Sequence, residues 1–147
     1  MIHPAPTTKI DPRHTRGTLL ELRPETATKP AFAVVAFPNT RYELHLIPKS
    51  AIATQPGKRI VGTIHARAKR IDEVGTGGRY VEPVAGRPRR VQGVIVAVET
   101  PTNEIVVNAG VPIHCRPTDP RQQAADFREG QFVSFDVMEG AEFSPIA

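Results

Sequence analysis

Hydrophobic and polar positions alternate along several short stretches of the chain, the period that is typical of β-strands. In "QFVSFDVMEG" (131–140), the apolar side chains Val133, Phe135 and Val137 alternate with polar neighbours. In "KRIVGTIHARAKRI" (58–71), the even positions are small and apolar, whereas the odd positions become basic toward the end of the segment. This pattern predicts a half-buried strand whose outward face carries cations, and Gly62 within it predicts close approach of a neighbouring element.

Further strands and one helix are predicted between turn signals. The predicted strands span residues 17–25, 31–37, 41–47, 90–99 and 104–113, and the last two form a hairpin across the turn at 100–103. The single helix is predicted at 118–130, where Asp119 can cap, Pro120 suits the first turn and Gly130 can end the helix. The chain holds 15 prolines and 11 glycines, which suits short strands better than long helices.

These elements predict a mainly β fold: a small Greek-key β-barrel of the OB type with one short helix and additional N-terminal strands. We expect a flexible N-terminal arm over 1–15 and one domain over 16–147. Within that domain, 16–48 supplies N-terminal strands and 57–147 the OB-like core. Cys115 is the only cysteine, and no stretch has the length of a signal peptide or membrane span. The sequence therefore predicts a cytoplasmic protein that does not associate with a membrane.

The net charge of +4 conceals an asymmetry along the chain. Residues 57–93 carry nine Lys/Arg and three Asp/Glu, whereas residues 94–147 carry three and eight. Two interpretations remain open. The basic and acidic segments can pair with each other, within one chain or between copies, or the basic segment can present a face to a polyanion.

The C-terminal third resembles cold-shock domains. "REGQFVSFDVMEGAEFSP" (128–145) is similar to the late strands of that family, and "GVIVAVETPTNEIVV" (93–107) has the place and length of its early hairpin. The resemblance implies an OB-like barrel. Cold-shock domains bind single strands through aromatic side chains on that hairpin, and residues 93–107 contain none. The resemblance therefore carries over no binding residues.

A basic strand and the loop after it are the candidate nucleic-acid interface. Arginine side chains bind phosphates through planar forks, and a tyrosine ring can stack on a base. The predicted nucleic-acid-binding residues are His65, Arg67, Lys69, Arg70, Arg79, Tyr80, Arg87, Arg89 and Arg90.

No catalytic residue, metal ligand or cofactor is predicted. His45, His65 and His114 lack the short spacings of known metal motifs, and neither Cys115 nor Ser134 has a spaced base partner. We therefore expect a non-enzymatic module that binds single-stranded RNA or DNA by electrostatics. The alternative is a structural protein that self-associates through its basic middle and acidic C-terminal segments. A small-ligand barrel is a third hypothesis, with no ligand indicated.

Overall fold

The alternating stretches form strands in the computed structural model, which describes residues 11–146. In its first half, the strands are β1 (Thr15–Arg23), β2 (Phe32–Ala36), β3 (Glu43–Pro48), β4 (Arg59–Ala68), β5 (Asp72–Glu73), β6 (Tyr80–Glu82) and β7 (Ala85–Gly86). In its second half, they are β8 (Arg90–Glu99), β9 (Glu104–Asn108), β10 (Pro112–Pro117), β11 (Phe132–Asp136) and β12 (Glu142–Pro145). Two 3₁₀ turns, η1 (Thr100–Thr102) and η2 (Ala124–Asp126), complete the described elements.

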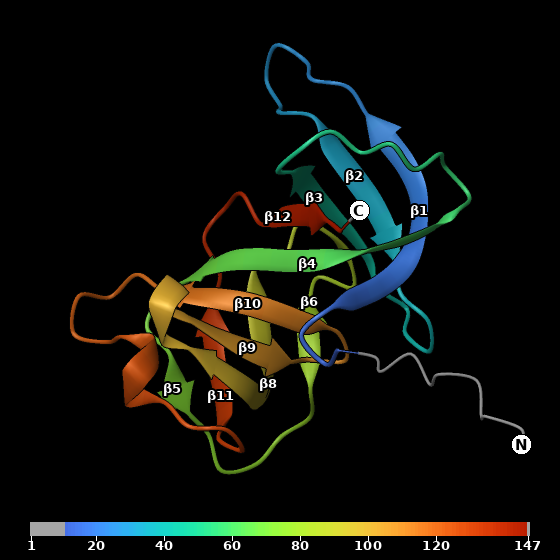
Figure 1. Cartoon of the computed structure of the whole chain (residues 1–147). Helices are drawn as coiled ribbons and strands as arrows, with labels where there is room; N and C mark the ends of the chain where they lie inside the picture. Colours follow the sequence, from blue (N-terminus) through green and yellow to red (C-terminus); the bar gives the residue numbers. More distant parts are fainter. Residues whose placement is uncertain (1–10, 147) are drawn as a thin grey trace, which may run out of the picture.

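Five strands close into a small barrel. The hydrogen-bonded order runs β1-β2-β3-β12-β4, and β1 also pairs with β4, so the ring has no free edge. Figure 1 shows this ring in the upper part of the molecule. The predicted mainly β fold with a small barrel is confirmed.

The remaining strands continue the same sheet from the second half of β4: on the edge opposite β12, β1 pairs with residues 59–62 and β10 with residues 65–68. The order there is β4-β10-β9-β8-β11-β5, with β6 paired to β8. An isolated bridge between Ala68 and Val137 brings the end of β11 back to β4. The long strand β4 is therefore shared by both groups of strands (Figure 1), and its side chains reach both.

The predicted alternation of β4 is confirmed. Ile60, Ile64 and the other even positions are buried, whereas Arg67 is exposed on the opposite face. The close approach at Gly62 is also confirmed: a Cβ atom there would lie 2.4 Å from the backbone oxygen of Ser144 and 2.5 Å from the Phe143 ring. The approaching element is β12, a strand that the sequence pattern did not predict.

Two predicted elements differ from the structure. The segment 104–113 was expected as one strand, but β9 ends at Asn108, whose side chain accepts a hydrogen bond from the backbone N–H of Gly110. Gly110 has a φ of +97°, which turns the chain into the separate strand β10.

The predicted helix at 118–130 is wrong, because only the 3₁₀ turn η2 forms there. The polar side chains that suggested a helix make other bonds. The Asp119 carboxylate accepts bonds from Arg121, and the Gln122 side chain pairs with both backbone groups of Ile71. The capping box forms around η2, between Gln123 and Asp126, rather than at Asp119.

The segment before β1 is only partly described. Residues 1–10 of the predicted flexible arm lie outside the described residues. Residues 11–14 lie against the sheet. The Arg13 side chain forms an ion pair with Glu99 of β8, and the Arg13 backbone oxygen accepts a hydrogen bond from His114 of β10. Within residues 11–146, no helix has the length and apolar character needed to cross a membrane.

Candidate nucleic-acid interface

Two adjoining depressions form a groove beside the end of β4. One, of about 550 Å³, lies between β2, β3, β4 and the segment 139–141. The other, of about 720 Å³, lies under the loop between β6 and β8. They share Gly86 and Arg87, so the two depressions are neighbours. We define the basic groove by its five cations and two rings: Lys29, Arg67, Arg87, Arg89, Arg90, Phe32 and His45.

The two rings of the groove stack on each other. Phe32 of β2 and His45 of β3 have ring centroids 4.9 Å apart and planes inclined by 15°. Antiparallel pairing of β2 and β3 places Val34 opposite His45. Phe32 lies two residues before Val34, on the same face of the sheet, and is therefore the diagonal neighbour of His45. Burial lowers the pKa of His45, and the charge of Arg23 acts in the same direction. The imidazole is therefore mostly neutral at neutral pH and serves as a flat ring rather than a charge.

Arg67 and Arg87 both line the depression beside β4, and Arg87 also lines the second depression. The Arg67 guanidinium donates to the backbone oxygen of Glu139 at 2.8 Å, and Arg87 lies 3.6 Å from the Glu139 carboxylate. Both members of the second pair are exposed, with 57% and 85% of the side chain accessible. Exposed pairs of this kind contribute little free energy, so Arg87 can exchange this partner for a phosphate.

Arg89 and Arg90, where the loop after β7 meets β8, differ in their contacts. Arg89 is exposed, and its backbone is fixed by bonds to Glu82 and Val137. The Arg90 guanidinium donates to Asp136 at 2.8 Å, to Ser134 at 2.8 Å and to the Tyr80 hydroxyl. The hydrogen bonds to Tyr80 and then to Asp136 raise the pKa of Arg90. Arg90 therefore holds β8, β11 and β6 together, whereas Arg89 points its charge to solvent.

The structure brings together four of the nine residues predicted from the sequence. Arg67, Arg87, Arg89 and Arg90 line the basic groove. The other five do not line it: His65 bonds Glu104, Arg70 pairs with Asp72, Tyr80 bonds Arg90 and Gln92, and Lys69 and Arg79 are exposed elsewhere.

Three residues of the groove were missed: Lys29, Phe32 and His45. The alternation in 41–47 places His45 on the outward face. Phe32, on the preceding strand, could have indicated a second ring on that face. Only the strand pairing brings these two rings together.

Part of the charge asymmetry is neutralised within the chain. Among the described residues, two ion pairs join arginines of the basic middle to the acidic C-terminal third: Arg87 with Glu139, and Arg90 with Asp136. No carboxylate lies within 4 Å of the charged groups of Arg67, Lys69, Arg79 or Arg89 in the same part of the chain. Part of the basic middle therefore pairs with the C-terminal third within one chain, and these four cations remain without an acidic partner among the described residues.

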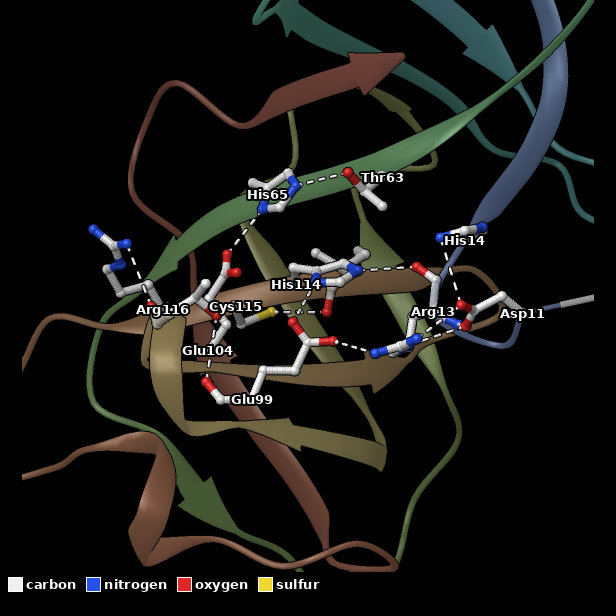
Figure 2. Close-up of polar contacts among 12 residues, drawn as sticks. Asp11, Arg13, His14, Thr63, His65, Glu99, Glu104, His114, Cys115 and Arg116 are labelled. Atoms are coloured by element: carbon white, nitrogen blue, oxygen red, sulfur yellow. Dashed lines mark hydrogen bonds and ion pairs between the residues drawn. The ribbon is translucent and has the colours of Figure 1, made fainter. Parts of the chain in front are cut away.

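A second polar cluster lies on the outer face of β4, β9 and β10, apart from the groove (Figure 2). His65 Nδ1 lies 2.8 Å from the Glu104 carboxylate, and the His114 ring lies 4.8 Å from the His65 ring. Burial alone would raise the pKa of Glu104, but the hydrogen bond and charge of His65, together with Thr102 and His114, lower it. Glu104 is therefore an anion beside two imidazoles, the donor types that transition metals bind.

No protein-family model matches this sequence, and neither the curated proteins nor the solved structures give a significant match. The resemblance of residues 128–145 to cold-shock domains therefore remains a prediction from the sequence.

Proposed function

We propose that this protein is a non-enzymatic module that binds single-stranded nucleic acid in the basic groove. The observation that carries the proposal is the meeting of a stacked ring pair with exposed arginines in two neighbouring depressions. Proteins that bind single strands combine these two features: cations that follow the phosphates and rings on which bases stack.

The charge balance of the groove favours an anionic ligand. Its lining holds five Lys/Arg side chains and three Asp/Glu side chains, a net charge of +2. Two of the three acids, Asp136 and Glu139, already contact arginines of the groove. Because these contacts are exposed or at the rim, a phosphate can replace the carboxylate without leaving a buried charge unpaired.

A single strand fits the two rings better than a duplex does. Bases in a duplex are stacked on one another and their faces are covered, whereas an unpaired base can stack on the exposed side of Phe32 or His45. We therefore expect single-stranded RNA or DNA to bind more tightly than a duplex of the same length.

The self-association alternative has less support. It requires the acidic groups of the C-terminal third to be available to another copy, and Glu104 is buried beside His65 of its own chain.

Replacing Phe32 with alanine tests the stacking part of the proposal. A stacked base contributes roughly 1–3 kcal/mol, so single-strand affinity should fall by about 5- to 150-fold. Fluorescence anisotropy of a labelled pyrimidine-rich oligonucleotide measures this change. The matched control is Phe127→Ala, which removes a partly buried ring of the core rim that does not line the groove.

The comparison with a duplex separates stacking from charge. Phe32→Ala should weaken single-strand binding and leave the weaker duplex binding unchanged. Equal loss for both ligands, or equal loss in Phe127→Ala, would contradict a stacking role for Phe32.

A further inference from the structure

Two histidines and a glutamate converge on the outer face of the sheet, far apart in sequence. His65 lies on β4, Glu104 on β9 and His114 on β10; the parallel pairing of β4 and β10 places His114 directly beside His65. One nitrogen of each ring and one carboxylate oxygen lie within 4.8 Å of one another. Figure 2 shows the two rings and the Glu104 carboxylate on the same side of the sheet.

His114 presents a nitrogen that no protein group satisfies. His114 is 5% exposed, and its Nε2 lies 2.9 Å from the backbone oxygen of Arg13. A carbonyl oxygen only accepts, so Nε2 carries a proton, and in the neutral ring Nδ1 holds a free lone pair. Nδ1 is buried and has no hydrogen-bond partner, the single such side-chain atom among the described residues. A buried polar atom without a partner is rare in folded proteins and indicates a missing donor or cation.

The Thr63 hydroxyl can keep its hydrogen bond to His65 in either tautomer of the ring. Its Nδ1 lies 2.8 Å from Glu104 Oε2, and its Nε2 lies 2.7 Å from the Thr63 hydroxyl. The hydroxyl can donate to Nε2 or accept from it. When a cation takes the Nδ1 lone pair, the ring proton moves to Nε2 and the Thr63 hydroxyl turns from donor to acceptor.

The outer hydrogen bonds of the cluster match those of metal-binding histidines. Such histidines usually donate their second nitrogen to a carbonyl, a carboxylate or a similar acceptor, which fixes the ring and its tautomer. Here the Arg13 carbonyl serves His114 and the Thr63 hydroxyl serves His65. A second carboxylate lies near the same nitrogen, because Glu99 Oε2 is 3.8 Å from His114 Nδ1.

We infer that His65, Glu104 and His114 form a binding site for a divalent first-row transition metal, Zn²⁺ in particular. Two imidazoles and one carboxylate are a donor set that zinc takes with a fourth position left open. Tetrahedral zinc holds its ligand atoms roughly 3.4 Å apart, from bond lengths of about 2.0–2.1 Å. Here the His65 and Glu104 ligand atoms are 2.8 Å apart, and all three ligand atoms lie within 4.8 Å of one another. These distances lie on both sides of the tetrahedral spacing, so small side-chain rotations would bring the three atoms to it.

The site is independent of nucleic-acid binding in the groove. The metal would join β4, β9 and β10, and through the Arg13 carbonyl it would fix the segment before β1. The His65 side chain is 23% exposed, which leaves a route for the ion to enter.

Titration of the purified full chain with Zn²⁺ tests the site. Isothermal calorimetry should give one zinc per chain, and the thermal unfolding midpoint should rise with zinc concentration, because the ion binds the folded chain. Co²⁺ should bind with the strong visible absorption of four-coordinate cobalt. The partly exposed His65→Gln variant and the isosteric Glu104→Gln variant should each remove the calorimetric signal and the cobalt spectrum.

Two further variants distinguish zinc binding at this cluster from zinc binding by surface histidines. Thr63→Val keeps all three ligands and should weaken zinc binding by about 10- to 100-fold. His14→Gln removes a ring outside the set and should leave binding unchanged. Absence of saturable binding, or binding that survives both His65→Gln and Glu104→Gln, would overturn the proposal.

Discussion

Replacing Phe143 with alanine should lower the free energy of unfolding by about 3–5 kcal/mol, the usual cost of removing a buried aromatic side chain. Phe143 is fully buried on β12, where it lies opposite Ile64 of β4 and covers Gly62. Its backbone oxygen accepts a bond from Lys49 at 2.8 Å, which ties β12 to the end of β3. Denaturant unfolding followed by circular dichroism measures the change.

The matched control is Phe32→Ala, because Phe32 is partly exposed and lies outside the buried core. We expect this control to cost about 1 kcal/mol or less. An equally small loss in Phe143→Ala would show that β12 does not close the barrel.

Reversing Arg67, Arg87 and Arg89 to glutamate should weaken oligonucleotide binding by about 100-fold or more. Each charged hydrogen bond to a phosphate contributes roughly 1.5–3 kcal/mol, although neighbouring contributions do not add fully. All three side chains are exposed, so the fold should persist. Arg90 stays unchanged, because its guanidinium holds Asp136 and Ser134.

The control reverses Lys58, Arg79 and Arg128, exposed cations that do not line the groove. Each reversal changes the charge by −2, so both triple variants take the net charge from +4 to −2. Because the net charge is matched, only the position differs. Equal loss in the two variants would mean that binding follows total charge rather than the groove.

Local patterns predicted much of the fold. Alternation identified β4, β8 and β11 and the outward cations of β4, because a period of two fixes which face each side chain occupies. The same rules failed for residues 118–130, because the contacts of Gln122 with Ile71 are tertiary. They also missed β12, whose four residues pair with β3 and β4 across the molecule.

The candidate sites were less predictable than the fold. Arg67 and Arg87 could be proposed from the charge run, but the stacking of Phe32 on His45 depends on the register of β2 and β3. The cluster of His65, Glu104 and His114 shows the same limit. Spacing rules detect metal ligands that are close in sequence, whereas sheet pairing assembles these three from separate strands.

The salt dependence of single-strand binding tests the central claim most directly. Affinity for a labelled oligonucleotide would be measured from low to physiological salt. Each phosphate contact contributes about −0.7 to the slope of log affinity against log salt for single strands, so three to five groove cations predict a slope of about −2 to −3.5. Binding with that slope, reduced in the groove variant and kept in its control, is the expected result. No binding at the lowest salt, or a slope near zero, would contradict the proposed function.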